Sequence, residues 1–414
     1  MSNRLINWID QRFPFTFFIK HELTEYPTPR NLSYWWNFGF LAGFVLVLQI
    51  ATGIFLAMYY KPDSALAFDS VQHIMRDVNY GWLLRYIHST GASAFFIVIY
   101  VHMARTLYYA SYHKPRELMW WTGQGLMLML MATAFMGYLL PWGQMSYWGA
   151  QVITNLFGVT PFIGDQVVLW LRGDFAVGDA TLTRFFALHY LFPFLILGAV
   201  VIHLVALHTV RSSNPSGISL AAKDNIPFHP YFTIKDFFGL GVYLIVFCAF
   251  VFFRPDTFIE PPNNIPANPL VTPPHIEPEW YFLPFYAILR SIPDMLGGVV
   301  AMGLSVVIFA ILPFADRSGL PGGAHFRPVY RIMFYLFMAD VLLLGYVGSQ
   351  PPSGIFVPLG QAATFVYFAT FFLLPFISKW EERWMRSRGL PPELVALFDK
   401  RPPRVKLPHQ EEAA

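Results

Sequence analysis

Four histidines occupy apolar stretches that are long enough to cross a membrane, and both stretches space them identically. His88 and His102 are fourteen residues apart, and so are His189 and His203. Fourteen residues of α-helix turn through roughly 1400°, about 40° short of four full turns, and rise ~21 Å, so each pair lies on one helix face. Because histidine inside a membrane span is costly and usually functional, the spacing predicts one functional histidine toward each end of each helix.

The two histidine helices run in the same direction, which makes His88 level with His189 and His102 level with His203. Neutral imidazole is a common ligand of iron and other transition metals, and two facing imidazoles suit haem iron. The alternative is four packing histidines bonded to neighbouring carbonyl groups; matched pairs on parallel helices favour two haem sites instead. The single cysteine, Cys248, excludes an intrachain disulfide, a cysteine-based iron–sulfur or zinc site and a covalent c-type haem.

The helices that position these histidines belong to a strongly apolar chain. Of its 414 residues, 55% are hydrophobic and 13% are charged, whereas soluble proteins carry about 25% charged residues. Lipid must therefore be the solvent for much of the chain. The net charge of +3, with the basic residues spread over loops, gives no nucleic-acid interface. Stretches of roughly 20 apolar residues predict membrane spans, and eight qualify: 37–60, 83–108, 118–141, 183–209, 236–254, 297–315, 330–348 and 358–378.

An even number of spans places both termini on one side of the membrane. The loops on that side carry nineteen Lys and Arg residues and the opposite loops carry four, so the termini are expected to be cytoplasmic, on the electrically negative side. The fold class is therefore an all-α polytopic membrane protein with eight transmembrane helices. The expected divisions are an interfacial, uncleaved segment (1–36), a haem-binding four-helix bundle (37–209), a C-terminal transmembrane domain (210–378) and a basic tail (379–414).

Two long segments, 142–182 and 255–296, lie between spans on the positive side. Neither shows an obvious helix or strand, and loops of this length are usually functional or disordered. Both are rich in aromatic residues, including Trp142, Trp170 and Trp280. This composition favours ordered, functional loops over disorder.

Four glycines on neighbouring spans repeat the histidine period. Gly39 and Gly53 are fourteen residues apart, as are Gly123 and Gly137. Glycine allows another group to approach a helix backbone closely, so these positions could form flat surfaces against which two macrocycles lie. Ordinary small-residue helix packing is the alternative. The matched period favours contact with haem.

Two arginines lie one helical turn outward from a histidine, each toward its own membrane surface. Arg85 precedes His88 by three residues, and Arg105 follows His102 by three. A guanidinium group pairs well with a carboxylate, and haem propionates would point in these directions. Arginines that simply extend to the membrane surface are the alternative.

Five motifs occur together in this chain: 33–39 (SYWWNFG), 85–91 (RYIHSTG), 137–149 (GYLLPWGQMSYWG), 183–189 (TRFFALH) and 278–281 (PEWY). In combination they resemble the cytochrome b family, and the likeness runs through nearly the whole chain. The chain is unsplit and keeps equal histidine spacings, so it resembles the bc type rather than the split plastid b-f type.

The resemblance implies two non-covalent b haems, one of low potential on His88 and His189 and one of high potential on His102 and His203. It also implies ubiquinol and ubiquinone as substrates, a Rieske iron–sulfur protein and a c-type cytochrome as partners, and a homodimeric complex in the lipid bilayer. A bacterial plasma membrane is expected, in preference to the mitochondrial inner membrane.

The motif at 278–281 lies in the second long loop, level with the His88–His189 pair. A carboxylate close to a quinol ring can accept a hydrogen bond and then a proton. The resemblance assigns this role to Glu279, and it places Pro278, Tyr281 and Tyr138 around the same quinol. A solvated loop residue is the alternative for a glutamate flanked by proline.

On the negative side, His208 lies five residues beyond His203, and Asp236 opens the following span. A histidine and an aspartate at the membrane edge could bond the two carbonyls of a quinone and deliver protons. A helix-end histidine is more often a capping or surface group, so this assignment depends on the resemblance. The residues that it places around the quinone-reduction site are His208, Ser212, Lys235, Asp236 and Asn37.

The implied reaction sends one quinol electron to the iron–sulfur partner and the other across the two haems to a quinone on the negative side. Proton release on one side and uptake on the other would energise the membrane. Two other functions are possible from the residues alone. A transporter or channel would predict inverted repeats and interrupted spans, and a haem-b reductase of small substrates would not need the Glu279 motif.

Overall fold

The computed structural model describes residues 4–217, 224–390 and 394–395. Within these ranges it contains eight helices or helix runs that are long and apolar enough to cross a membrane, each overlapping one expected span. The expected all-α polytopic fold is therefore confirmed. The spans are Tyr34–Ala57 (η2, Tyr34–Trp36, and α3, Phe38–Ala57), α5 (Gly81–Tyr108), α6 (Glu117–Leu139), α9 (Asp179–Val210), α10 (Tyr231–Phe253), Met295–Ala315 (α12, Met295–Val307; η6, Ile308–Ile311; α13, Leu312–Ala315), α15 (Pro328–Gly348) and α16 (Phe356–Ser387).

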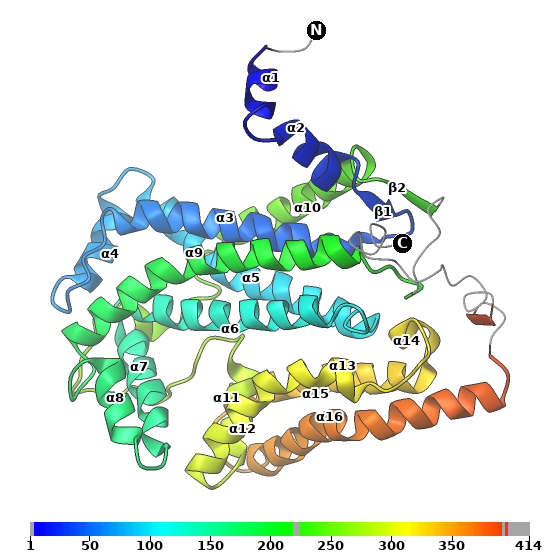
Figure 1. Ribbon diagram of the computed structural model, residues 1–414. Helices are drawn as coiled ribbons and strands as arrows, with labels where there is room; N and C mark the ends of the chain where they lie inside the picture. Colours follow the sequence, from blue (N-terminus) through cyan, green and yellow to red (C-terminus); the bar gives the residue numbers. More distant parts are fainter. Residues whose placement is uncertain (1–3, 218–223, 391–393, 396–414) are drawn as a thin grey trace.

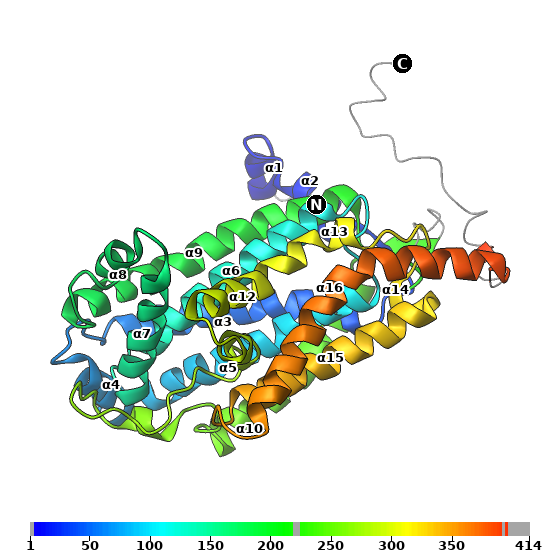
Figure 2. The same cartoon turned by 90° about the horizontal axis from the view of Figure 1, so that it is seen from below.

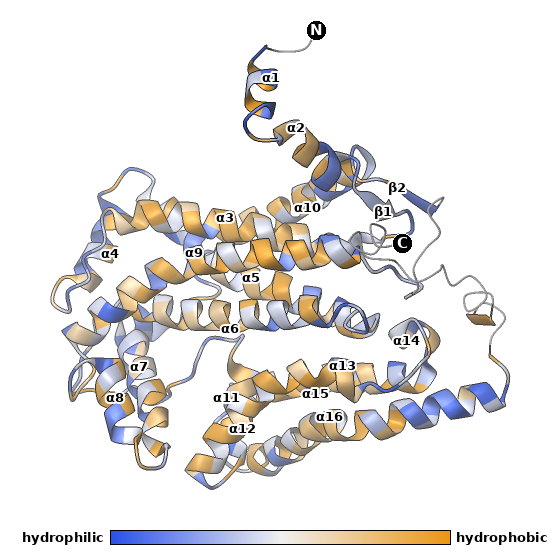
Figure 3. Cartoon of the chain, in the orientation of Figure 1, coloured by the Kyte–Doolittle hydropathy of each residue, from blue (hydrophilic) through white to orange (hydrophobic). Residues whose placement is uncertain are grey.

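The spans lie side by side along a common direction (Figures 1 and 2). Helix α3 packs along α5 and α6 packs along α9, so the two histidine helices each have a glycine-bearing neighbour. Hydrophobic residues cover the middle of the spans, and hydrophilic residues gather at their ends and on the last turns of α16 (Figure 3). This distribution is the one that a lipid bilayer selects.

Short elements cover the two ends of the bundle. At one end, called the α7–α8 end, lie α4 (Ala67–Arg76), α7 (Gln144–Leu156) and α8 (Gly164–Arg172) (Figure 1). At the other, called the β-strand end, β1 (Pro27–Pro29) pairs antiparallel with β2 (Asn225–Pro227). The N-terminal segment leads to this pair through α1 (Arg4–Asp10), α2 (Phe15–Phe18) and a π-helix, η1 (Ile19–Thr24).

The two long loops contain helices that the sequence analysis did not predict. Segment 142–182 folds into α7 and α8, and segment 255–296 contains α11 (Leu283–Ser291). These helices have 9 to 13 residues, too few for a span of roughly 20, and short apolar runs are ambiguous by periodicity. The remaining short elements are η3 (Phe157–Val159), η5 (Pro261–Asn264) and α14 (Gly323–Phe326).

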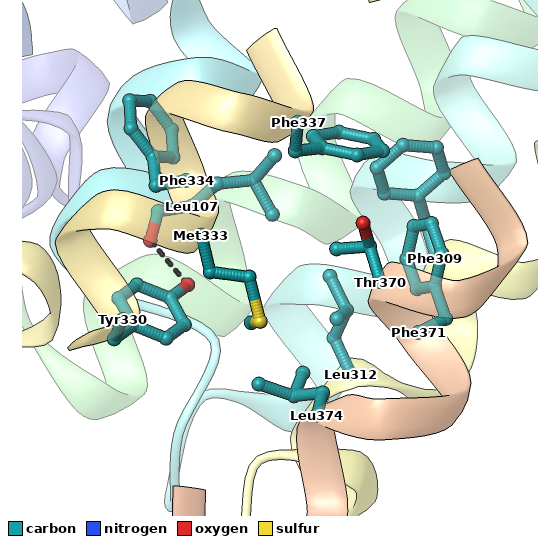
Figure 4. Close-up of a pocket in the computed structure, with 10 residues that line it drawn as sticks. All are labelled: Leu107, Phe309, Leu312, Tyr330, Met333, Phe334, Phe337, Thr370, Phe371 and Leu374. Atoms are coloured by element: carbon teal, nitrogen blue, oxygen red, sulfur yellow. Dashed lines mark hydrogen bonds between the residues drawn. The ribbon is translucent and has the colours of Figure 1, made fainter. Parts of the chain in front are cut away.

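Aromatic side chains form the core between the C-terminal spans and α5. Phe309, Phe337 and Phe371 meet at ring-centroid distances of 5.1 to 6.1 Å, and the Tyr330 hydroxyl donates to the Leu107 carbonyl at 2.8 Å (Figure 4). A cavity of about 30 Å³ remains among these residues. The C-terminal spans are thus joined to the end of a histidine helix by packing and by a buried hydrogen bond.

Helix α16 continues to Ser387, nine residues beyond the expected span. Its polar extension is held by a buried ion cluster: Arg327 contacts Asp316 at 2.7 Å and Glu381 at 3.1 Å, and all three side chains are fully buried. Glu381 also accepts from the backbone N–H groups of Val329 and Tyr330. Because the desolvated charges are paired, the last turns of α16 dock against the start of α15.

Candidate functional site

His88 and His189 face each other across the bundle from α5 and α9. Their ring centroids are 6.2 Å apart and the rings are nearly perpendicular, at 82°. His189 Nδ1 donates to the Thr133 carbonyl at 2.8 Å. The Thr52 hydroxyl donates to Leu48 O and accepts from His88 Nδ1 at 2.9 Å. Each ring therefore carries its proton on Nδ1 and leaves the Nε2 lone pair for a metal.

The second pair is supported in a related way. The Thr122 hydroxyl donates to Met119 O and accepts from His203 Nδ1 at 2.9 Å, which again leaves Nε2 as a possible ligand atom. His102 differs because the Arg105 guanidinium donates to its Nδ1 at 3.3 Å. Binding a metal through His102 Nε2 requires Arg105 to release Nδ1.

Each of the four glycines faces one histidine ring at its own level. A Cβ atom added to Gly39, Gly53 or Gly123 would lie 3.3, 3.2 or 3.4 Å from Cε1 of His102, His88 or His203. A Cβ at Gly137 would overlap the ring of His189. The glycines thus keep α3 and α6 close to the rings: a Cβ at Gly137 would displace the imidazole, at Gly39 and Gly53 it would be tightly packed, and at Gly123 it would only touch the ring.

A cavity of about 250 Å³ lies at the His88–His189 level. His88, His189, Gly53, Gly137 and Arg85 contribute to its wall. Among the residues that the structure describes, no group of three or more His, Cys, Asp or Glu side chains could hold a metal ion. His88 and His189, with the cavity beside them, would hold a cofactor that carries its own metal ion.

The two arginines are placed near these levels. Arg85 is half-buried and lines the cavity. The Arg105 guanidinium lies 5.1 Å from the Trp36 ring centroid, and its buried Nε has no hydrogen-bond partner among the described residues. A buried donor without a partner is costly, and a carboxylate from a bound group would satisfy it.

Glu279 lies in the wall of the same cavity as the first histidine pair. The Tyr281 hydroxyl donates to Glu279 Oε1 at 3.0 Å, and the buried Tyr281 ring stacks on Phe96 at 3.8 Å. The Trp280 indole donates to Ser93 Oγ at 3.1 Å, which attaches the loop to α5. Pro278 is half-buried immediately before Glu279. The four-residue motif is therefore an ordered wall and not a solvated loop.

Burial raises the pKa of Glu279 to about 7, against an opposing effect from the Tyr281 hydrogen bond. Tyr138 lines the cavity as well, and its buried hydroxyl has no hydrogen-bond partner among the described residues. A second carboxylate, Glu260, adds to the rise of the Glu279 pKa. Sequence reasoning did not find Glu260, because it lies nineteen residues before Glu279 in a loop without a recognisable motif.

The residues expected on the opposite side form two groups at the β-strand end. In the first, Asn37 Nδ2 donates to Asp236 Oδ1 at 2.8 Å, joining the start of α3 to the start of α10. The Lys235 side chain is not part of this contact. Its ammonium group donates to Leu32 O at 2.5 Å and lies 4.9 Å from the Tyr34 ring centroid. Lys235 therefore holds the segment before α3 and does not pair with Asp236.

The second group surrounds His208 at the end of α9. His208 Nδ1 is hydrogen-bonded to Glu22 Oε2, and the Tyr26 ring stacks on the imidazole at 4.4 Å and 23°. Ser212 donates its hydroxyl to Ser213 O, and its own carbonyl accepts from Arg116 at 3.5 Å. Sequence reasoning missed Glu22, Tyr26 and Arg116. It also missed Thr52 and Thr122, although each directly precedes a glycine of the repeated spacing.

Comparisons with known proteins agree on one family. Residues 23–211 match the family model described as cytochrome b/b6/petB, and residues 266–368 match that of cytochrome b(C-terminal)/b6/petD. The chain is 57% identical to cytochrome b of Rickettsia prowazekii (strain Madrid E) and 56% identical to that of Rhodospirillum rubrum; each match covers 92% of this chain and 96% or 94% of the relative. A solved chain of a hyperthermophilic respiratory Complex III superposes with a TM-score of 0.86 at 40% identity, covering 92% of this chain and 100% of that one.

Proposed function

The chain belongs to the cytochrome b family and is the membrane-embedded cytochrome b of a bc complex. We propose that it holds two b haems and couples quinol oxidation on one membrane surface to quinone reduction on the other. One observation carries the proposal. Glu279, a carboxyl group whose pKa lies near 7, and the His88–His189 pair line the same cavity. A group that could accept a proton and two imidazoles that could bind a metal thus line one cavity.

The four histidines would hold the haems in pairs, His88 with His189 and His102 with His203. Bound haem supplies one-electron redox chemistry. The chain's own contribution is to present Nε2 atoms, which the hydrogen bonds from Nδ1 to Thr52, Thr133 and Thr122 support. Hydrogen bonds of this kind to Nδ1 fix the tautomer and orientation of a histidine that binds metal through Nε2. Arg85 and Arg105 would pair with the propionates, and Gly39, Gly53, Gly123 and Gly137 would leave room beside the rings.

Quinol oxidation releases two protons and two electrons. Glu279 would accept one proton, because a carboxyl with a pKa near 7 is partly ionised at neutral pH and matches the task of a general base. Tyr281 orients the carboxylate, and Pro278 and Tyr138 complete the wall. One electron would leave to a Rieske iron–sulfur partner, while the other crosses the membrane within this chain.

Quinone reduction would occur at the β-strand end, beside His208 and Asp236. The Asn37 amide positions the Asp236 carboxylate, and Lys235 and Ser212 hold the adjoining segments. Protons taken up here and released near Glu279 would give net transfer across the membrane, as in a Q cycle. The proposal includes ubiquinone as substrate, a c-type cytochrome as a further partner, a homodimeric complex, and a bacterial plasma membrane with cytoplasmic termini.

A redox titration of haem absorbance in isolated membranes tests the two-haem arrangement. Two b-haem components that titrate separately are expected, together with turnover that is sensitive to quinol-site inhibitors. A single component, or turnover that such inhibitors leave unchanged, would overturn the proposal in favour of a simpler haem-b reductase. The match to the cytochrome b family argues against the alternative function of a transporter or channel.

A further inference from the structure

We propose that His21, Glu22 and His208 form a proton-entry relay from the aqueous phase to the quinone-reduction site. The relay rests on the proposed function, because it supplies protons to that site. His21 Nδ1 lies 2.7 Å from Glu22 Oε1, and the other carboxylate oxygen, Oε2, is hydrogen-bonded to Nδ1 of His208. One carboxylate therefore connects two imidazoles.

Exposure decreases from the outer imidazole to the inner one. The His21 side chain is 65% exposed, whereas Glu22 and His208 are 29% and 26% exposed. The outer histidine is accessible to water and the inner one lies at the end of α9, five residues beyond His203. The three groups thus form a continuous path from the aqueous surface toward the level of the second histidine pair.

The local fold holds these groups in place. His21 and Glu22 lie in the π-helix η1, closed by a bond of 2.7 Å from Glu25 N–H to Lys20 O. Single π-helical turns occur frequently at functional sites. Beyond η1, Tyr26 stacks on the His208 ring, and the β1–β2 pair fastens the segment to the chain before α10. The carboxylate is therefore positioned by packing on both sides.

The charges around the relay define which atoms carry protons. Hydrogen bonds from His208 and then His21 hold the pKa of Glu22 below its usual range, so the carboxylate is ionised at rest and ready to take up a proton. The Glu22 carboxylate faces Nδ1 of both imidazoles, so Nε2 of His208 is the atom that can face a quinone oxygen. Tyr26 lies beside the relay, and the charges of Arg211, Glu22 and Arg116 act on it.

The proton balance of this step is simple. Converting a quinone to a quinol forms two O–H bonds and consumes two electrons, which arrive by the proposed route, and two protons. A proton from water would pass through His21 to Glu22, and the Glu22 carboxyl would give it to Nδ1 of His208 while the Nε2–H of His208 goes to a quinone oxygen. Asp236 would deliver the second proton. No further reactant is needed.

The test measures electron transfer in membranes between quinone and the haem held by His102 and His203, with the Glu279 site blocked by an inhibitor. Glu22→Gln and His21→Gln keep the size and hydrogen bonding of the side chains but remove proton transfer. We expect Glu22→Gln to slow the reaction about tenfold or more, because proton transfer by a positioned side chain typically contributes 10²–10⁴-fold. Imidazole added to the buffer, a small diffusible proton donor, should restore the rate of both variants.

His73→Gln is the matched control. His73 Nδ1 also lies 2.9 Å from a carboxylate, Asp77 Oδ2, but this exposed pair lies at the C-terminal end of α4, at the opposite end of the bundle. Electron transfer between quinone and haem in His73→Gln should be as fast as in the parent protein. Variant rates that imidazole does not restore would overturn the relay and give Glu22 a structural role.

Two further variants, His208→Asn and Asp236→Asn, separate failure of the relay from failure of the proposed function. Parental rates in both would mean that quinone is not reduced here, so the proposed site itself would be wrong. A loss in these two with parental rates and pH dependence in Glu22→Gln and His21→Gln would overturn the relay alone. If Glu22→Gln does not assemble, His21→Gln decides, because its side chain is mostly exposed.

Discussion

The Tyr281 hydroxyl donates a hydrogen bond to Glu279 Oε1 at 3.0 Å, although the two residues are separated only by Trp280. The Tyr281 ring cannot turn away, since it is 3% exposed and stacked on Phe96 at an interplanar angle of 6°. The Tyr100 hydroxyl also donates to the Tyr281 carbonyl at 2.6 Å. These contacts hold the Glu279 carboxyl in the wall of the cavity that it shares with His88.

Glu279→Gln should slow quinol oxidation while leaving quinol binding intact. Glutamine keeps the size and a hydrogen-bonding carbonyl but cannot accept the proton, so a loss of about ten- to a hundredfold or more is expected. Steady-state quinol oxidation measures it. The control is reduction of the His102–His203 haem by quinol at the opposite site, with the Glu279 site blocked, and its rate should not change. A Gln variant that turns over at the parental rate at every pH would make Glu279 a structural loop residue.

The pH dependence of quinol oxidation should follow the ionisation of Glu279. Burial raises the pKa of this carboxyl to about 7, so the base is protonated and inactive below that pH and ionised above it. The rate should therefore rise as the pH increases through about 7. The Tyr281 hydrogen bond lowers the same pKa, so Tyr281→Phe should move the midpoint to higher pH. An unshifted midpoint in Tyr281→Phe, or the same rise in Glu279→Gln, would contradict this assignment.

Gly137→Val should disturb the haem held by His88 and His189 more than the other haem. The added Cβ overlaps the His189 ring, whereas the corresponding approach at Gly123 to His203 is 3.4 Å. Absorbance spectra of each haem measure the effect. Gly123→Val is the reciprocal control and should affect the His102–His203 haem. A change confined to the opposite haem in either variant would overturn the assignment of levels.

Replacing His102 or His203 by a residue that cannot bind iron should remove one haem and block electron exit. The His88–His189 haem should persist, because neither its ligands nor the threonines that hydrogen-bond to them, Thr52 and Thr133, are changed. Haem content and a redox titration measure the outcome. Loss of both haems in assembled protein would contradict two independent levels.

Arg327→Ala should destabilise the C-terminal helices. Burial alone would raise the pKa of Asp316, but Arg327 and His113 hold it well below its usual range. Removing the guanidinium leaves Asp316 and Glu381 buried without their cation, and breaking a buried pair in this way costs about 3–5 kcal/mol. Thermal unfolding in detergent measures the change.

Lys379→Ala provides the control for Arg327. The Lys379 side chain is 51% exposed and lies 3.3 Å from Glu382, and pairs of this kind contribute about 1 kcal/mol or less. Equal losses of stability in the two variants would show that the buried cluster has no special role.

The eight spans and the levels of the four histidines could be predicted from local sequence patterns. Both follow from local properties: the bilayer requires continuous apolar stretches, and the helical repeat converts a spacing of fourteen residues into a shared face. Glycines with the same period could be paired with the histidines for the same reason. Short helices such as α7 and α11 could not be found this way, because neither hydropathy nor length separates them from loops.

The groups that support these positions depend on long-range contacts and could not be predicted from the sequence. Glu22 and His208 are 186 residues apart, and Arg327 and Glu381 are 54 apart. Their contacts depend on the π-helical turn, on the β1–β2 pairing and on the extension of α16, which no local pattern specifies. A partner across the bundle is selected by how helices pack and by which buried charges must be neutralised. For this reason a relay beside His208 becomes visible only once the N-terminal segment is folded against α9.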